Sequence, residues 1–172
     1  MRHEDMATKM PRGLDMAEAS VLDYLRFVIE CRRMDCVISR PYANFEDFVL
    51  LNGRHFNVIP YPAKYKRRTA YLKACFLNTY KLADKYPDLK YVEGYAKAER
   101  VCGGLHAWVV DPSGNVIDPT WQNDATEYYG VIFNMDYVRR VLNQKKEYGV
   151  IDNWKNQWAL LDGTETEWKV TG

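Results

Sequence analysis

The chain has almost no net charge and no long apolar run. Its 24 lysines and arginines offset 23 aspartates and glutamates, leaving a formal net charge of +1. A balanced chain offers no overall electrostatic attraction to nucleic acid or to an anionic membrane surface. No stretch approaches the roughly 18 apolar residues that a membrane span requires. We therefore expect neither nucleic acid nor membrane among its partners.

Cysteine is scarce, and the usual features of a secreted protein are missing. The chain has four cysteines, Cys31, Cys36, Cys75 and Cys102. Residues 1–13 alternate charged and polar side chains and contain no apolar segment of the kind found in signal peptides. Free thiols in a reducing compartment are therefore expected, and the sequence predicts a cytoplasmic protein.

The sequence also lacks the short motifs that mark phosphate, dinucleotide or serine chemistry. It contains no P-loop, no GxGxxG turn and no serine nucleophile elbow. A zinc site is the remaining alternative, with Cys102 and His106 joined by Cys75 and Asp118. Structural zinc sites usually show two closely spaced ligand pairs, and the chain offers no good second pair. We therefore predict no metal and no cofactor.

The 172 residues suffice for one domain with a sizeable core. We expect a loose N-terminal arm at residues 1–13 and a single domain at 14–172. Apolar residues at three- and four-residue spacing predict a helix from Leu14 to about 31–34, with Asp15 as its cap. A short helix should follow Asn44 and end at Asn52-Gly53. Residues 36–39 and 54–65 should be extended or irregular.

The second half of the chain reads as an antiparallel sheet with two more helices. Strands are predicted at 91–96, 105–110, 115–121 and 128–133. A helix should follow Asn134 or Asp136, and residues 158–170 should add a strand or pack across the sheet. The expected fold class is α+β, with helices first and then a sheet of four or five strands packed against a helix that carries Cys75.

The turn between the strands at 105–110 and 115–121 makes a geometric prediction. Pro112-Ser113-Gly114 suits a three-residue hairpin loop with its glycine in the left-handed conformation. In that register Asp111 pairs with Asn115, and His106 and Asp118 become diagonal neighbours on one face, roughly 7 Å apart. A loop of two or four residues would place them on opposite faces. Asp118 should therefore orient His106.

The position of Cys75 in its helix is open on the sequence alone. If the helix begins near Thr69, Cys75 lies mid-helix and is an ordinary buried thiol. If the helix begins at Ala74 or Cys75, the helix N-terminus would stabilise a thiolate and offer a backbone N–H to an oxyanion. The residues from Lys64 to Lys73 form the densest basic cluster. It is either a solvated face or a surface that attracts acidic substrates.

The order of these segments resembles the transglutaminase-like branch of the papain-like cysteine protease and amidase superfamily. Members carry a cysteine at a helix start, a strand of the type YVxGYA, a His-Ala-Trp and an Asp-Pro-Thr. Here the matching segments are Cys75 and residues 91–96, 106–108 and 118–120. The resemblance implies a papain-like fold with Cys75 as nucleophile, His106 as base and Asp118 as orienting group. The chain departs from the family at Lys73-Ala74, where members often have a glycine before the cysteine.

A thiol, an imidazole and a carboxylate are the parts needed for acyl transfer through a thioester. The expected substrate is a peptide, a protein or a small amide, with hydrolysis favoured over transfer to an amine. Trp108 and Trp121 are predicted to line the substrate pocket, Trp121 being the better candidate. The oxyanion should bind the backbone N–H of Cys75. The candidates for a second donor are Asn57, Tyr61 and Tyr65.

Three alternatives stay open at this stage. His55 is a reserve candidate for the base. Glu93, inside an apolar strand, should lie on a solvated face or pair with a basic side chain. The alternative function is a binding module that keeps the fold, lacks catalysis and contacts a protein partner.

Overall fold

The computed structural model describes Asp15, residues 18–33, 40–65, Tyr71, and residues 73–98 and 101–170, apart from the side chains of Arg33, Val101 and Cys102. The expected arm at 1–13 and extended piece at 36–39 lie outside the described residues, as does the basic cluster between 66 and 70.

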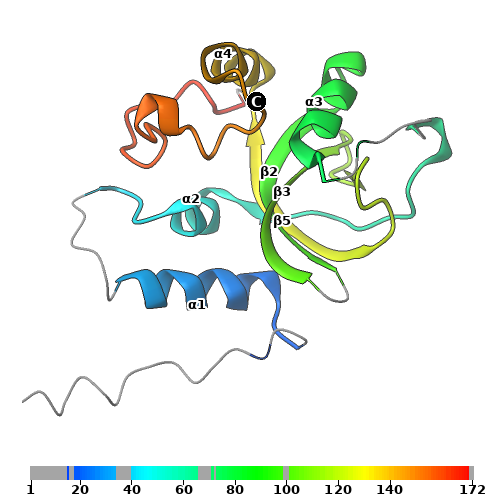
Figure 1. Cartoon of the computed structure of the whole chain (residues 1–172). Coiled ribbons are helices and arrows are strands. Elements are labelled where there is room, and N and C mark those ends of the chain that lie inside the picture. Colours follow the sequence, from blue (N-terminus) through cyan, green and yellow to red (C-terminus); the bar gives the residue numbers. More distant parts are fainter. Residues whose placement is uncertain are drawn as a thin grey trace, which may run out of the picture.

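The described chain is α+β, as predicted, with an antiparallel five-stranded sheet in the order β1-β5-β2-β3-β4. In Figure 1, α3 and α4 lie near the upper end of the sheet and α1 and α2 beside its lower part. Short 3₁₀ turns occur at Ala63–Tyr65 and Trp154–Asn156. The helices and strands are α1 Val21–Arg33, α2 Phe45–Asn52, β1 Arg54–His55, α3 Cys75–Lys85, β2 Lys90–Ala98, β3 Val101–Val110, β4 Val116–Ile117, β5 Ala125–Phe133 and α4 Met135–Lys145.

The start of α1 corrects one prediction. The helix begins at Val21 rather than Leu14, because Ser20 and Asp23 form its cap. The Asp23 backbone N–H donates to Ser20 Oγ at 3.1 Å, and the Ser20 N–H donates to Asp23 Oδ2 at 3.1 Å. This reciprocal pair satisfies two helix-end donors. Asp15, the expected cap, instead accepts bonds in a turn before the helix.

The caps of α2 and α4 follow the prediction. Asn44 caps α2 by accepting the Asp47 N–H at 2.8 Å, and the helix ends at Gly53. Asn134 caps α4 by accepting the N–H groups of Asp136 and Tyr137.

None of the helices among the described residues has the length and apolar character that crossing a membrane requires.

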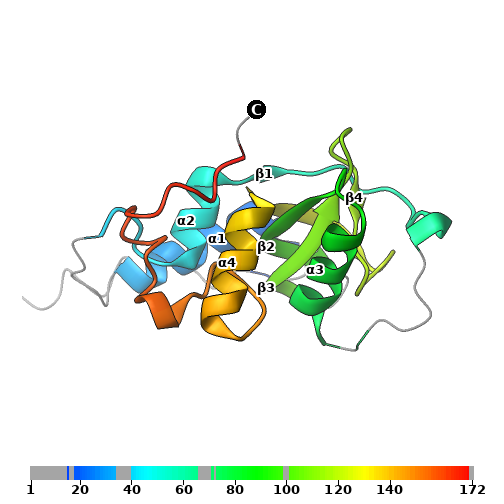
Figure 2. The same ribbon diagram turned by 90° about the horizontal axis from the view of Figure 1, so that it is seen from above.

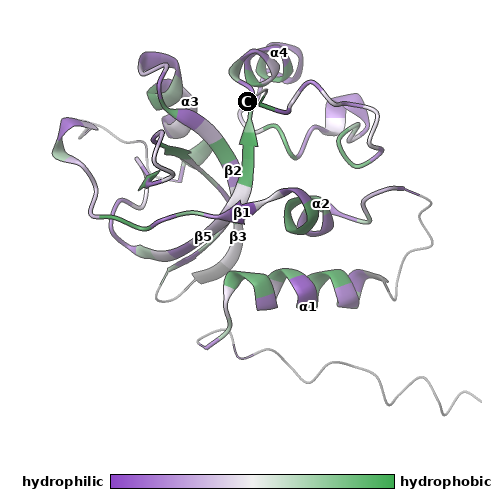
Figure 3. Cartoon of the chain, turned by 180° about the vertical axis from the view of Figure 1, so that it is seen from behind, coloured by the Kyte–Doolittle hydropathy of each residue, from purple (hydrophilic) through white to green (hydrophobic). Residues whose placement is uncertain are grey.

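The two faces of the sheet bury different clusters. One face, which carries Tyr91 and Val109, packs against the helices and forms the main core. The other face carries Trp108 and Tyr128 and forms a smaller core with Phe56. Figure 2 shows α3 at the side of β3 and β4, away from α1 and α2. Figure 3 shows that α1 turns hydrophobic residues toward the sheet and hydrophilic ones away from it.

Two glycines let β2 and β5 approach closely. A Cβ at Gly94 would lie 2.3 Å from the carbonyl oxygen of Tyr129. A Cβ at Gly130 would lie 2.7 Å from both the Glu93 carbonyl oxygen and the ring of Trp108. Real Cβ atoms do not tolerate such contacts, so both positions require glycine. The missing side chain at Gly130 makes the space in which the Trp108 ring sits.

The C-terminal segment packs against the sheet without adding a strand among its described residues. Trp168 contacts the rings of Phe48 and Phe133, and its carbonyl accepts the Asn134 N–H. Glu93 holds the other end of this segment. Its carboxylate accepts the backbone N–H groups of Val150 at 2.7 Å and Ile151 at 2.9 Å.

The burial of Glu93 overturns both expectations for it. The side chain is fully buried, and besides the two backbone N–H groups it accepts the Tyr91 hydroxyl at 2.6 Å. Burial raises the pKa of Glu93, although the three hydrogen bonds and the charge of Lys145 oppose the rise. Glu93 therefore lies neither on a solvated face nor in an ion pair with a basic side chain. It ties the sheet to the segment that follows α4.

Candidate active site

The helix α3 begins at Cys75, which corresponds to the second of the two predicted starts. Lys73 has a left-handed backbone with φ of 58°, a conformation that is uncommon for any residue other than glycine. Ala74 precedes the helix and offers no side-chain cap. Cys75 is partly buried and unoxidised. Its thiol thus stands at the positive end of the helix dipole, which favours negative charge.

Asn78, one turn into the helix, holds the segment that precedes it. Its side chain is fully buried. Its Oδ1 accepts the Tyr71 N–H at 3.1 Å, and its Nδ2 donates to the Tyr71 carbonyl at 2.9 Å. The same Nδ2 donates to Thr120 Oγ1 at 3.1 Å. Asn78 therefore joins the chain that leads into Cys75 to the loop that follows Asp118.

Thr79 fixes α3 against the histidine strand. Its hydroxyl donates to the carbonyl of Ala107 at 2.9 Å, and both residues are buried. Because Ala107 follows His106 directly, this bond fixes the position of α3 along β3, and with it the position of Cys75 relative to the imidazole. Asn78 and Thr79 are both poor helix formers, and two of them in succession inside an apolar helix are the signal that sequence reasoning could have used.

The hairpin has the predicted register. Val109 pairs with Ile117 and Val110 with Val116, which sets Asp111 opposite Asn115. Gly114 has φ of 80°, the left-handed conformation that the three-residue loop needs. The backbone N–H groups of Ser113 and Asn115 each donate to Asp111 Oδ1 at 2.9 Å.

His106 and Asp118 meet as this register requires. His106 Nε2 lies 2.6 Å from Asp118 Oδ2, and both side chains are almost fully buried. Asp118 Oδ1 accepts the backbone N–H groups of Thr120 at 2.8 Å and Trp121 at 3.0 Å. Asp118 Oδ2 also accepts the hydroxyl of Tyr128 at 2.9 Å. Four donors thus hold one carboxylate in a fixed orientation.

The remaining ring nitrogen of His106 faces the thiol. Burial disfavours the charged imidazole, but hydrogen bonds to Asp118 and Cys75 and the charges of both groups outweigh it. Together they raise the pKa of His106 to about 9. Since Asp118 occupies Nε2, the bond to Cys75 uses Nδ1. The structure therefore brings the three predicted residues into one hydrogen-bonded chain.

The two predicted tryptophans have different positions. Trp121 is partly buried and stacks on the His106 ring, with 4.1 Å between ring centroids and 18° between planes. This π face lies against an imidazolium, an attractive arrangement. Trp108 is fully buried, between the rings of Phe56 and Tyr128. A side chain without exposed surface does not line a substrate pocket, so the prediction for Trp108 is wrong.

Tyr128 is the site residue that the sequence did not reveal. It lies on β5, which is separated from β3 by β2, and its hydroxyl crosses the smaller core to reach Asp118. Its signal would be the register of β5 against β2, in which Tyr128 pairs with Ala96. Nothing local to residues 125–133 fixes that register.

The other candidates lie elsewhere. His55 is exposed on β1 and lies 3.8 Å from Glu127, far along the sheet order from β3. Asn57 pairs with Asn115 beside the hairpin turn. The Tyr61 hydroxyl donates to the carbonyl of Tyr65. None of the three oxyanion candidates has a described contact with Cys75. Among the described residues no cluster of three or more histidine, cysteine or acidic side chains could hold a metal ion.

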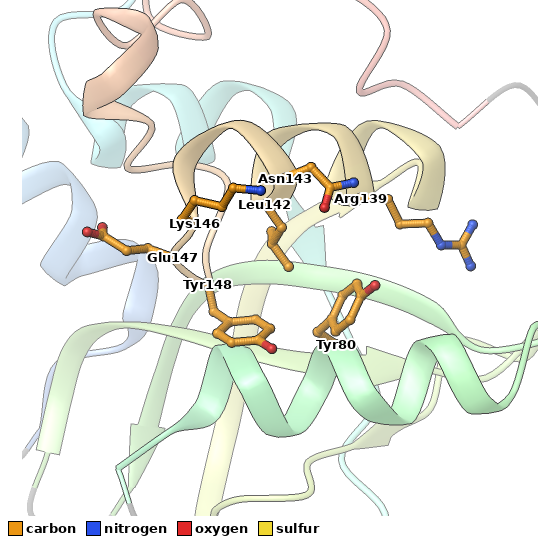
Figure 4. A pocket seen from close by; sticks show the side chains of 7 residues that line it. All are labelled: Tyr80, Arg139, Leu142, Asn143, Lys146, Glu147 and Tyr148. Carbon is orange, nitrogen blue, oxygen red and sulfur yellow. The ribbon is translucent and has the colours of Figure 1, made fainter.

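A groove separates α3 from α4 and is distinct from the triad (Figure 4). Its volume is about 220 Å³. Tyr80 and Tyr148 form one side, with 5.7 Å between their ring centroids, and Leu142 lies between them and the α4 rim. Charged and polar side chains at its rim are Arg139, Asn143, Lys146 and Glu147. Cys75, His106 and Asp118 do not line it.

Comparisons of the chain with protein-family models, with curated proteins and with solved structures gave no match.

Proposed function

We propose that the protein is a cysteine-dependent enzyme that transfers the acyl group of an amide through a thioester. The observation that carries the proposal is the continuous chain from the thiol of Cys75 through His106 to the buried carboxylate of Asp118. A nucleophile, a base and an orienting acid in contact are the arrangement that such chemistry needs. The resemblance of the segments around these residues to transglutaminase-like enzymes of the papain-like superfamily supports the same proposal.

In the first half of the reaction, His106 already holds the proton on Nδ1 and Cys75 acts as the thiolate, because the raised pKa of His106 keeps the imidazole charged near neutral pH. The thiolate attacks the carbonyl carbon, forming the C–S bond while the C=O electron pair moves to oxygen. In this proposal the backbone N–H of Cys75, at the start of α3, donates to that oxyanion. When the tetrahedral intermediate collapses, the C–N bond breaks and the leaving amine takes the proton from His106.

In the second half, a nucleophile attacks the thioester while His106 accepts its proton, and Cys75 leaves as thiolate. Water as nucleophile gives a carboxylic acid, and an amine gives a new amide. We favour hydrolysis, because no acidic pocket that would bind an amine is evident beside the triad among the described residues. Asp118 stabilises the imidazolium in both halves and fixes which nitrogen faces the thiol.

Selective alkylation tests the nucleophile without knowledge of the substrate. Iodoacetamide should modify Cys75 much faster than Cys31 at neutral pH, because a thiolate and not a thiol attacks the reagent. Cys31 is a matched control, since it also lies on a helix and is also partly buried. Peptide mass spectrometry gives both rates in one sample. Equal rates at the two cysteines would refute the proposed role of Cys75.

His106→Ala completes this test. The variant should label Cys75 at a rate close to that of Cys31, whereas His55→Ala should label like the wild type. A panel of peptides and small amides, assayed for released ammonia and for cleavage, then identifies the substrate class. Hydrolysis by the wild type and not by Cys75→Ala is the expected result.

The alternative function, a binding module without catalysis, has one feature in its favour. The groove between α3 and α4 is a second concavity with two tyrosines and a polar rim (Figure 4). A binding module would need no reactive thiol, so slow labelling of Cys75 combined with normal folding would favour it.

A further inference from the structure

The two carboxylate oxygens of Asp118 accept hydrogen bonds from different kinds of donor. Oδ1 accepts two backbone N–H groups, which belong to the loop that immediately follows Asp118. Oδ2 accepts the two side-chain donors, His106 Nε2 at 2.6 Å and the Tyr128 hydroxyl at 2.9 Å. The two side chains therefore compete for the same oxygen. A second donor on one carboxylate oxygen reduces the negative charge that the first donor meets.

We propose that Tyr128 is a positioning residue that shares Asp118 Oδ2 with His106 and thereby limits how firmly the carboxylate holds the imidazole proton. The inference rests on the proposed function only for its catalytic consequence, since the sharing itself is a property of the resting protein. Tyr128 does not contact the thiol in any described interaction. It acts through Asp118.

Tyr128 is suited to this role because its hydroxyl stays protonated and so acts as a donor toward the carboxylate. Burial, together with the negative charge of Asp118, raises the pKa of Tyr128 far above the range in which a folded protein is studied. Its ring is held by Trp108 at 4.9 Å between centroids, and its backbone carbonyl accepts the Phe56 N–H at 3.2 Å. The hydroxyl therefore stays protonated and stays aimed at Asp118.

This sharing makes it easier for His106 to give its proton to the leaving amine. A general acid works best when its pKa lies near the working pH. Asp118 and Cys75 already raise the pKa of His106 to about 9, and a carboxylate without the competing hydroxyl would raise it further. The leaving amine would then receive its proton less readily. Tyr128 moderates the pull of Asp118 and so keeps His106 usable as an acid.

Among the described residues, few other titratable groups lie near the hydrogen-bonded series formed by Cys75, His106, Asp118 and Tyr128. Cys75 approaches from α3, and Asp118 from the loop after β4. Asp124 contributes its charge to Tyr128 from the turn before β5. Tyr91 lies on β2, hydrogen-bonded to Glu93 and within electrostatic range of Cys75. None of them competes with His106 for Asp118 Oδ2.

Tyr128→Phe removes the hydroxyl and keeps the ring. We expect the pKa of His106, followed by ¹⁵N-labelled imidazole NMR without substrate, to rise by about half a unit to one unit, the size expected for one lost hydrogen bond. The kcat of amide hydrolysis near pH 7 should fall several-fold with KM unchanged, because the buried tyrosine does not contact substrate. The alkaline limb of the rate profile should move up with the NMR titration.

Tyr129→Phe is the matched control on the neighbouring position. Its hydroxyl donates to the carbonyl of Leu50 at 3.0 Å, away from the triad. This variant also loses one buried tyrosine hydroxyl bond, but it should leave both the His106 titration and kcat unchanged. A shift of equal size in both variants would mean that the effect is a general loss of packing, and it would overturn the proposal.

A fluorinated tyrosine at position 128 should change the pKa of His106 in the opposite direction. It also replaces Tyr128→Phe as the test if that variant folds poorly. Ring fluorination makes the hydroxyl a stronger donor, so the pKa of His106 should fall instead of rise. Opposite shifts in the two variants are the expected result. An unchanged titration in both, or a fall in Tyr128→Phe, would overturn the inference. Because the NMR readout needs no substrate, failure to find amide hydrolysis would count against the proposed function and leave this test intact.

Discussion

Two buried carboxylates, Glu93 on β2 and Asp118 directly after β4, are held in nearly the same way. Asp118 accepts two consecutive backbone N–H groups and a tyrosine hydroxyl, those of Thr120, Trp121 and Tyr128. Glu93 likewise accepts two consecutive backbone N–H groups and a tyrosine hydroxyl, those of Val150, Ile151 and Tyr91. In each case the same set of neutral donors compensates a charge removed from water.

The difference between the two carboxylates is the fourth partner. Asp118 also contacts His106, whose ring reaches the partly buried Cys75. Glu93 has no comparable contact to a nucleophile and instead holds the segment after α4 against the sheet. Burial and satisfied hydrogen bonds therefore do not distinguish the proposed catalytic carboxylate from the structural one. The two differ in whether a further contact connects the carboxylate to a nucleophile.

Asp118→Asn should give the largest effect and should act on activity. An amide group in this place would present a donor or a weak acceptor to Nε2 and favour the wrong imidazole tautomer, which in a triad costs about 10⁴-fold in kcat. Assays on the identified amide substrate measure this loss, and alkylation of Cys75 should slow in parallel. Activity within tenfold of the wild type would remove Asp118 from the triad.

The pH dependence of stability should come next in size. The pKa of His106 rises from its ordinary 6.5 to about 9 on folding. The stabilisation is therefore fully present below pH 6.5 and is lost as the pH rises through about 9, amounting to about 3 kcal/mol. Urea unfolding between pH 6 and 10 measures it. In Asp118→Asn the loss over this interval should be much smaller, and an unchanged slope would contradict the assignment.

Glu93→Gln should have the smallest effect of the three and should act on stability alone. The glutamine amide would place a donor against a backbone N–H of Val150 or Ile151, and an unmade bond of this kind costs about 1–3 kcal/mol. Denaturant unfolding at neutral pH gives the value. Activity per folded molecule and the labelling rate of Cys75 should match the wild type, and a large loss in either would place Glu93 in the catalytic machinery.

Glu93→Gln also separates the two carboxylates by pH. Burial raises the pKa of Glu93 above its ordinary 4.5, so its contribution to stability falls as the pH rises from about 4.5 upward. The variant should lack this fall at acidic pH while keeping the change between pH 6.5 and 9 that belongs to His106.

Local chemistry made the hairpin and the caps of α2 and α4 predictable. Pro112-Ser113-Gly114 fixes its own register, and that register alone brings Asp118 to His106. Asn44 and Asn134 cap their helices through bonds that span two or three residues. The presence of the strands β2, β3 and β5 and the α+β class followed from patterns of the same short range.

Contacts between distant segments were beyond such reasoning. Glu93 reads as exposed or ion-paired until Val150 and Ile151, far along the chain, supply its partners. Trp108 reads as a pocket wall until Gly130 on another strand makes room for its ring. Tyr128 reaches Asp118 only because β5 lies beside β2. Each depends on a register that no nearby residue sets.

The length of the loop at 112–114 has a consequence for how this chain can change over generations. Adding or deleting one residue there would shift the register of the hairpin and turn Asp118 away from His106, with no substitution at Cys75, His106 or Asp118. Most surface turns accept such changes in length freely. If the proposed catalysis holds, the number of residues between the two strands is part of what builds the site, so this turn should resist insertions and deletions as strongly as Cys75, His106 and Asp118 resist replacement.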